Sequence, residues 1–198
     1  SKFVWRYDFL LGHPAAGSAH RFNPANLGAV LAIGLLPGAW LSPGQWGQAT
    51  TVAVLVLTLG VAVSSRAARG DASWVFLGTF AALMTARMLW LGANPWIVWH
   101  QLNNGALLLF AFFMISDPMT TPRLRAHRLA FAAVVAMGAF AWQFGAFRPH
   151  GPVIALFVAS LAVPALNRRA AARQAPLHYD WHPAKSSPVC HPSPPAAR

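Results

Sequence analysis

Charged residues are scarce in this 198-residue sequence, and acidic residues are the scarcest of them. Only 10% of the residues are charged, with four Asp plus Glu against fifteen Lys plus Arg, whereas a soluble domain carries about 25%. A soluble fold of this length cannot hide a sequence that is 56% hydrophobic inside one core, but a lipid bilayer can solvate it. The composition excludes an ordinary soluble domain and predicts an integral membrane protein.

Cysteine is nearly absent. The single cysteine, Cys190, lies in a Pro-rich tail, which excludes a disulfide or a cysteine-ligated iron–sulfur cluster formed within the chain. The tail histidines His178, His182 and His191 are irregularly spaced, so we expect no metal site there. The sequence also shows no nucleophile–base pair and no phosphate-binding glycine motif, which argues against a hydrolase.

Long apolar runs are what the sequence has in abundance. Six of them approach or reach the length of about 20 helical residues that crosses a hydrocarbon layer. They cover approximately residues 25–41, 49–65, 74–92, 96–116, 128–147 and 152–167. The first and last are short, and either a full crossing or a re-entrant course is open for them. The predicted fold class is an all-α membrane protein of about six transmembrane helices.

Two domains follow from this pattern. Residues 1–169 are predicted to form the transmembrane domain, and residues 170–198, rich in Pro and Ala, a disordered tail. The segment Ser1–Leu11 is predicted to be the end of a helix that begins upstream. We therefore expect the chain to be the later part of a larger membrane domain.

The basic residues predict the orientation in the membrane. They lie in the N-terminal segment, in the loops 66–73 and 117–127 and in the tail, whereas the opposite loops hold Arg148 alone. Basic loops stay cytoplasmic, so these segments are predicted to face the cytoplasm of a bacterial-type inner membrane. Because the net charge of +11 is distributed over helix ends, we expect the lipid bilayer as partner and no nucleic acid.

Several polar residues interrupt the apolar segments. Arg87 lies in the third segment, where its guanidinium either reaches the outer interface or holds an anion inside the bundle. His100, Asn103 and Asn104 share a helix face in the fourth segment at a similar depth. Hydrogen bonding between helices and ligand binding are both open for this face.

A second polar cluster, Ser116–Pro122, follows the fourth segment. Its carboxylate, Asp117, can pair with a basic residue, position a ligand or cap a turn. The physics of an Asp-Pro sequence favours the capping role.

Two motifs resemble those of one known family. Residues 22–28 (FNPANLG) resemble the FNPA-type motif of the RnfD/NqrB family, and residues 115–122 (ISDPMTTP) resemble its (T/S)DP-x-(T/S)-x-P signature. The motifs occur in the expected order, and the resemblance covers roughly Ser1 to Arg169. It implies a membrane subunit of a redox-driven ion-translocating complex, with other subunits as partners, and helical repeats similar to those of urea transporters.

The resemblance also implies flavin binding, by FMN or riboflavin. The SGAT motif of covalent attachment is absent, and its nearest counterpart is Gly47–Thr50, which makes Thr50 the weak candidate for a covalent link. The expected noncovalent site comprises Asn23, Asn26, Asp117, Thr120 and Thr121 near the cytoplasmic side, and Arg87, His100 and Asn103 near the outer side. No self-contained catalytic site is predicted. The alternative is a passive channel or small-solute transporter of the same fold, which predicts a polar path joining the two groups.

Overall fold

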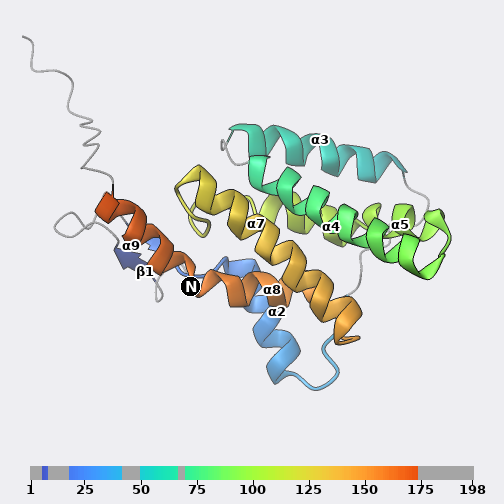
Figure 1. Ribbon diagram of the computed structural model, residues 1–198. Helices are drawn as coiled ribbons and strands as arrows, with labels where there is room; N and C mark the ends of the chain where they lie inside the picture. Colours follow the sequence, from blue (N-terminus) through green and yellow to red (C-terminus); the bar gives the residue numbers. More distant parts are fainter. Residues whose placement is uncertain (1–5, 9–17, 42–49, 67–69, 174–198) are drawn as a thin grey trace, which may run out of the picture.

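The computed structural model describes residues 6–8, 18–41, 50–66 and 70–173, most of which are helical (Figure 1). The helices are α2 (Pro24–Leu35), α3 (Thr50–Arg66), α4 (Gly70–Leu91), α5 (Pro95–Leu102), α6 (Gly105–Leu109), α7 (Arg125–Phe140), α8 (Gly151–Ser160) and α9 (Val163–Arg173). Two π-helical turns, η1 (Phe110–Met114) and η2 (Ala141–Gly145), extend α6 and α7. The predicted class, an all-α membrane protein, is confirmed.

A short hairpin is the exception to the helical content. Strand β1 (Arg6–Asp8) pairs antiparallel with β2 (Ser18–His20), with Arg6 opposite His20. The prediction that Ser1–Leu11 ends a helix is therefore wrong for residues 6–8. At the other end, α9 continues to Arg173, a few residues past the predicted boundary at residue 169.

Helix α7 is the centre of the bundle. It packs along α4 on one side and α8 on the other, while α2 lies against α8 and α3 against η1 and α4 (Figure 1). The core between these helices is aromatic and alanine-rich: Phe76 stacks on Phe80 and contacts Phe110, and Ala132 and Ala136 of α7 are fully buried. Small residues on α7 allow its neighbours to approach closely, as is common in membrane bundles.

The described residues contain fewer candidate membrane spans than expected. Gly70–Leu91 and Arg125–Gly145 are long and apolar enough to cross a bilayer, and Pro95–Met114 and Gly151–Ala170 qualify if each bent pair counts as one span. The count is two to four, against about six in the prediction. The bends measure 52° and 44°, and α2 has only 12 residues. The six apolar segments each contain a helix, but their lengths and bends could not be inferred from composition.

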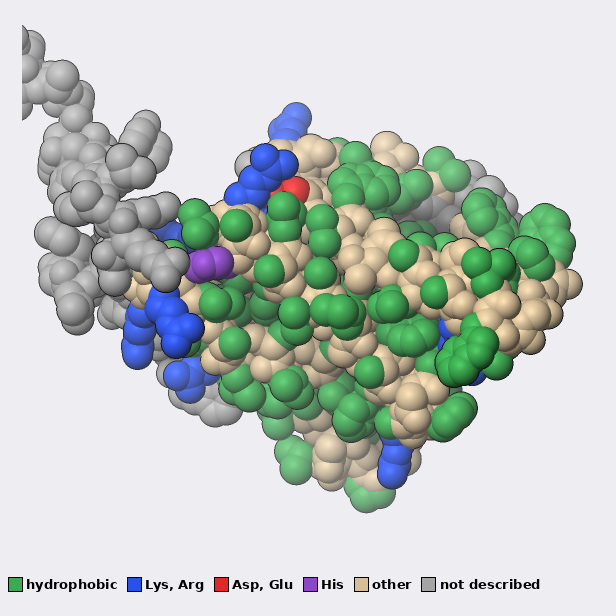
Figure 2. All heavy atoms as spheres, in the orientation of Figure 1, with side chains coloured by type: hydrophobic (Ala, Val, Ile, Leu, Met, Phe, Trp, Pro, Cys, Tyr) green, Lys and Arg blue, Asp and Glu red, His purple; other side chains and the backbone are tan. Residues whose placement is uncertain are grey.

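The outer surface of the bundle is largely apolar, as a lipid-facing surface must be. Leu35, Leu55, Leu89 and Val158, from four different helices, are all exposed. Figure 2 shows apolar side chains over much of one face, with Lys and Arg side chains gathered mainly toward one end of it. A soluble protein exposes mainly polar side chains, whereas this bundle exposes apolar ones. Its interior is still close-packed, as in a soluble protein.

Candidate functional site

The buried polar side chains of the described residues gather at one end of the bundle, which we call the polar end. Three long-range hydrogen bonds define it, joining Asn23 to Asp117, Arg128 to Asp71, and the Arg123 amide to Asn167. Here α2, α4 and α7 begin, and α3, η1 and α8 end. The basic residues Arg66, Arg125, Arg168 and Arg169, at helix ends and in α9, belong to the same end and are exposed.

Asn23 is positioned by the helix that it starts. Its backbone is extended, and its side-chain oxygen accepts hydrogen bonds from the amides of Ala25 and Asn26 at 3.0 and 3.2 Å. Pro24 follows at the first helical position, where its missing amide hydrogen costs nothing. Because capping uses the oxygen, the amide nitrogen of Asn23 is free to point toward a different segment.

That segment is the turn after η1. The Asn23 amide donates to the Asp117 carboxylate at 3.1 Å across 94 residues of sequence. The second carboxylate oxygen of Asp117 accepts from the Met119 amide at 3.0 Å, and its carbonyl accepts from the Thr121 hydroxyl at 2.9 Å. Asp117 therefore does cap its own turn, and it also bonds to the other motif.

The two motifs thus form one structure, which we call the motif junction: Asn23, Asn26, Asp117, Thr120 and Thr121. Asn23, Asn26 and both threonines are buried, and the amide of His20 donates to the Met119 carbonyl at 3.1 Å, holding β2 against the turn. A cavity of about 190 Å³ adjoins the junction, lined by Asn23, Ser64, Asp117 and apolar side chains of α3 and η1. The junction brings together five of the eight residues predicted for the noncovalent site.

Asn26 differs from the other junction residues in its hydrogen bonding. It is 1% exposed, and its side-chain oxygen has no hydrogen-bond partner among the described residues. A buried carbonyl oxygen without a partner costs about 1–3 kcal/mol. The junction therefore holds a buried acceptor that the described residues leave unpaired.

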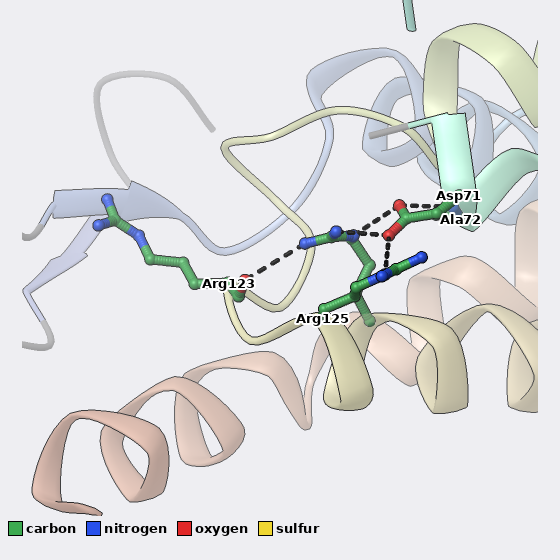
Figure 3. Close-up of polar contacts among 5 residues, drawn as sticks. Asp71, Ala72, Arg123 and Arg125 are labelled. Atoms are coloured by element: carbon green, nitrogen blue, oxygen red, sulfur yellow. Dashed lines mark hydrogen bonds and ion pairs between the residues drawn. The ribbon is translucent and has the colours of Figure 1, made fainter. Parts of the chain in front are cut away.

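The sequence analysis missed a second polar group at this end. Arg128 of α7 donates to both carboxylate oxygens of Asp71 in the first turn of α4, at 2.8 and 2.6 Å, and to the Arg123 carbonyl at 3.2 Å (Figure 3). Arg125 lies 3.5 Å from the same carboxylate but remains largely exposed. The signal that could have found this group was Asp71 itself, one of only four acidic residues, next to a basic loop.

The residues predicted near the outer side each make separate contacts among the described residues. Arg87 is half-buried, and its guanidinium lies 5.0 Å from the Phe144 ring centroid in η2. His100 is exposed, and the Asn103 amide donates to the Trp99 carbonyl of its own helix at 3.1 Å. None of these contacts joins Arg87 to His100 or Asn103, and the outer group stays a prediction. Asn104 caps α6 by accepting from the Ala106 amide.

The candidate for covalent flavin attachment and the polar path of the channel alternative are two further expectations. Thr50 is the first residue of α3, but its side chain and residues 47–49 lie outside the described part of the chain. The channel alternative expected a polar path between the two ends. Among the described residues, the buried side chains between them are apolar, chiefly Phe76, Phe80, Met84 and Phe110, so no such path joins the ends in this part of the molecule.

Comparison with known proteins covers the part of the chain that forms the motif junction. A sequence profile of the NQR2, RnfD, RnfE family matches residues 18–175. The RnfD subunit of the ion-translocating oxidoreductase complex from Escherichia fergusonii is 30% identical over 134 residues, covering 65% of this chain and 32% of that protein. The RnfD protein of Cronobacter sakazakii is 31% identical over 156 residues, covering 75% of this chain and 41% of its own length.

The chain thus spans about a third to two fifths of the length of these relatives. The matched residues include both motifs, every helix from α2 to α9 and the Asp71–Arg128 pair. Because the profile covers well over half of the chain, the resemblance seen in the two motifs is confirmed, and the chain belongs to the NQR2, RnfD, RnfE family.

Proposed function

We propose that this chain acts within a membrane subunit of an ion-translocating oxidoreductase complex. Family membership and the similarity to RnfD proteins of such complexes support this proposal. The observation that carries it is the Asn23–Asp117 hydrogen bond, because it joins the two family motifs into one buried junction. The proposed location is a bacterial inner membrane, with the polar end toward the cytoplasm and its anionic lipid.

In this proposal the motif junction is a positioning element. It fixes the angle at which α2 leaves the polar end and the course of the chain from η1 to α7. A rigid junction at a membrane boundary presents the turn 117–122 in one conformation, which is what docking of a partner subunit requires. Since the sequence predicts no self-contained catalytic site, the proposed role of the chain is to place partners and cofactors for electron transfer.

The test uses membrane vesicles from a strain lacking the gene, complemented with the wild-type chain or with Asp117→Ala. We expect redox-driven ion uptake to be restored by the wild type and reduced about tenfold or more by Asp117→Ala, with Val134→Ile as the control at an exposed position of α7 outside the junction. Flux of small solutes through liposomes containing this chain alone, without a redox partner, would instead establish the channel function.

Flavin binding is a separate proposal, supported by family resemblance alone. The described residues do not by themselves fit a flavin at the junction, because a cavity of about 190 Å³ is smaller than the roughly 300 Å³ at which ligand pockets begin. We propose that the junction, whose Asn23 and Asp117 line this cavity, supplies one wall of a noncovalent FMN or riboflavin site.

A visible absorbance spectrum tests this directly. The proposal expects flavin absorbance in the complex purified in detergent, release of the flavin by acid precipitation, and loss of most of it in Asp117→Ala. If flavin stays bound at wild-type stoichiometry in Asp117→Ala, the junction is not part of the flavin site. Flavin that remains with the precipitated chain would point to a covalent link, for which Thr50→Ala is the matched variant.

A further inference from the structure

One cavity beside the described residues lies at the end of the bundle opposite the polar end. Its volume is about 540 Å³, and its lining includes Trp40, Arg87, Gln143, Phe144, Phe147 and Arg148. Two cations and one amide thus face a space with aromatic walls, between α4 and the turn that joins η2 to α8. The family motifs and the proposed function assign no role to this cavity.

The positive charge in this cavity is not compensated by the side chains that the structure describes. Asp71 and Asp117 are both engaged at the polar end, and Asp8 lies in β1, whose partner strand β2 is held against the turn of that end. Arg87 lies sixteen positions after Asp71 on α4, which at 1.5 Å per residue separates them by about 24 Å along the helix. Arg87 has the Phe144 ring face as its described contact. At the edge of a bilayer a guanidinium meets water and lipid phosphates, so two uncompensated guanidinium groups at one cavity favour an anionic ligand there.

The second cation is held in place by its own loop. The Arg148 amide donates to the Trp142 carbonyl at 3.1 Å, and the Trp142 indole nitrogen donates to the Pro149 carbonyl at 3.1 Å. On either side, Phe147 and His150 have left-handed backbones, with φ of 52° and 66°. Two non-glycine residues in this conformation within four positions give the loop a defined shape, which sets Arg148 at the rim of the cavity.

The aromatic side chains around the cavity indicate how deep it lies in the membrane. Trp40 is 67% exposed and Phe147 is 79% exposed, and the candidate span Arg125–Gly145 ends immediately before this loop. Tryptophan and basic side chains at the end of a membrane span belong to the headgroup layer. The cavity therefore opens where phosphates and the first methylene groups of lipids are found.

We propose that this cavity binds the headgroup of one anionic phospholipid. Arg87 and Arg148 bind the phosphate diester, the Gln143 amide donates to it, and the acyl chains leave over Phe144 and Phe147. Paired guanidinium groups suit a phosphate because each offers several donors in a fixed plane. A soluble phosphate ester has the same charge, but the exposed apolar rim favours a ligand that carries acyl chains. This inference depends on the membrane fold and not on the proposed function.

Native mass spectrometry of the full chain in detergent tests the proposal. We expect the first phosphatidylglycerol to bind about tenfold more tightly than the first phosphatidylcholine of the same chain length. Arg148→Gln, at an exposed position, is expected to remove most of this difference in affinity. The double variant that combines Arg87→Gln with Arg148→Gln is expected to abolish it. Arg169→Gln, an exposed cation of the polar end, is the matched control and should leave the difference within about twofold.

Three outcomes would overturn the proposal. Equal binding of phosphatidylglycerol and phosphatidylcholine by the wild type would show that the cavity does not recognise anionic headgroups. A loss in Arg169→Gln as large as that in Arg148→Gln would show that net charge alone attracts the lipid. Displacement of phosphatidylglycerol by glycerol 3-phosphate or inorganic phosphate at equal concentration would show that the site takes a soluble phosphate. The unfolding temperature of each variant in detergent confirms that it is folded.

Discussion

At the scale of single residues, the Asn23–Asp117 hydrogen bond can be tested by exchanging its partners. Asn23→Asp keeps the oxygen that caps α2 but replaces the donor with a second carboxylate about 3 Å from the first. We expect this variant to lose about 1–3 kcal/mol of unfolding free energy in detergent. Combining Asn23→Asp with Asp117→Asn restores one donor and one acceptor, so most of the loss should be recovered.

A thermal unfolding series with the four proteins of this double-mutant cycle provides the measurement. The oxygen that accepts from the Met119 amide survives in Asp117→Asn, so the turn keeps its own cap. A double variant whose loss equals the sum of the two single losses would show that the two side chains do not interact. The bond would then carry no part of the junction's stability.

The Asp71–Arg128 pair allows a comparison between a buried and an exposed partner of one carboxylate. The Arg128 side chain is 8% exposed and that of Arg125 is 77% exposed, and both approach Asp71. Arg128→Met removes both hydrogen bonds to the carboxylate and leaves Arg125 as its remaining cation, so it should cost about 1–3 kcal/mol of unfolding free energy. Arg125→Gln should change it by less than about 1 kcal/mol. Equal losses in the two variants would contradict the assigned burial.

His150 predicts a pH dependence at the other end of the molecule. Burial lowers its pKa below the ordinary value of 6.5, so the unfolded chain binds the proton at a higher pH than the folded chain does. The contribution of His150 to stability is then complete above about pH 6.5 and is lost as the pH falls through the folded pKa. As the pH falls below 6.5, the unfolding temperature in detergent should therefore decrease less steeply in the His150→Asn variant than in the wild type. Asparagine is the chosen replacement because it also tolerates the left-handed backbone of this position. Identical slopes would exclude this contribution.

At the scale of helices, the contact between α7 and α8 depends on one glycine. A Cβ atom added to Gly151 would lie 2.5 Å from the Ala139 carbonyl oxygen, which is backbone and cannot move aside. Gly151→Ala should therefore lower the unfolding free energy by about 1–3 kcal/mol. Gly78→Ala in α4 is the matched control, because nothing lies within 4 Å of its added Cβ and alanine is the better helix former. A Gly151→Ala protein as stable as Gly78→Ala would show that α8 can shift away from α7.

Helix starts were predictable from the sequence because their signals are local. Asn-Pro marks the start of α2 at Asn23 and of α5 at Asn94, and in both cases the asparagine side chain accepts a hydrogen bond from the first turn. The π-helical turns η1 and η2 have no such signal. Each adds a residue to a turn and rotates the residues after it, so the face that Arg87 meets, Phe144 of η2, could not be read from the spacing.

At the scale of the whole molecule, the charge pattern predicted the two ends of the bundle, but not their contacts. Basic residues at the ends of apolar segments were expected on one side, and the bonds of Asp71, Asp117 and Asn167 join those ends in space. Which ends are neighbours depends on how the helices pack. The family resemblance placed Asn23 and Asp117 at the same side of the membrane, whereas their contact across 94 residues came only with the fold.

Orientation in the membrane is the property on which the proposed location of every site depends. Arg66 and Arg169 belong to the polar end, and Arg148 belongs to the opposite end. Moving a strongly basic end across a membrane is unfavourable, so the polar end should stay in the cytoplasm.

After Cys190→Ser removes the native thiol, single-cysteine variants Arg66→Cys, Arg169→Cys and Arg148→Cys report the two sides. In intact cells, a membrane-impermeant maleimide should label the variant at position 148 at least about fivefold faster than the other two, because the bilayer shields cytoplasmic thiols. Permeabilised cells should label all three. Labelling at position 169 in intact cells would reverse the orientation and, with it, the leaflet from which the Arg87–Arg148 cavity draws its lipid.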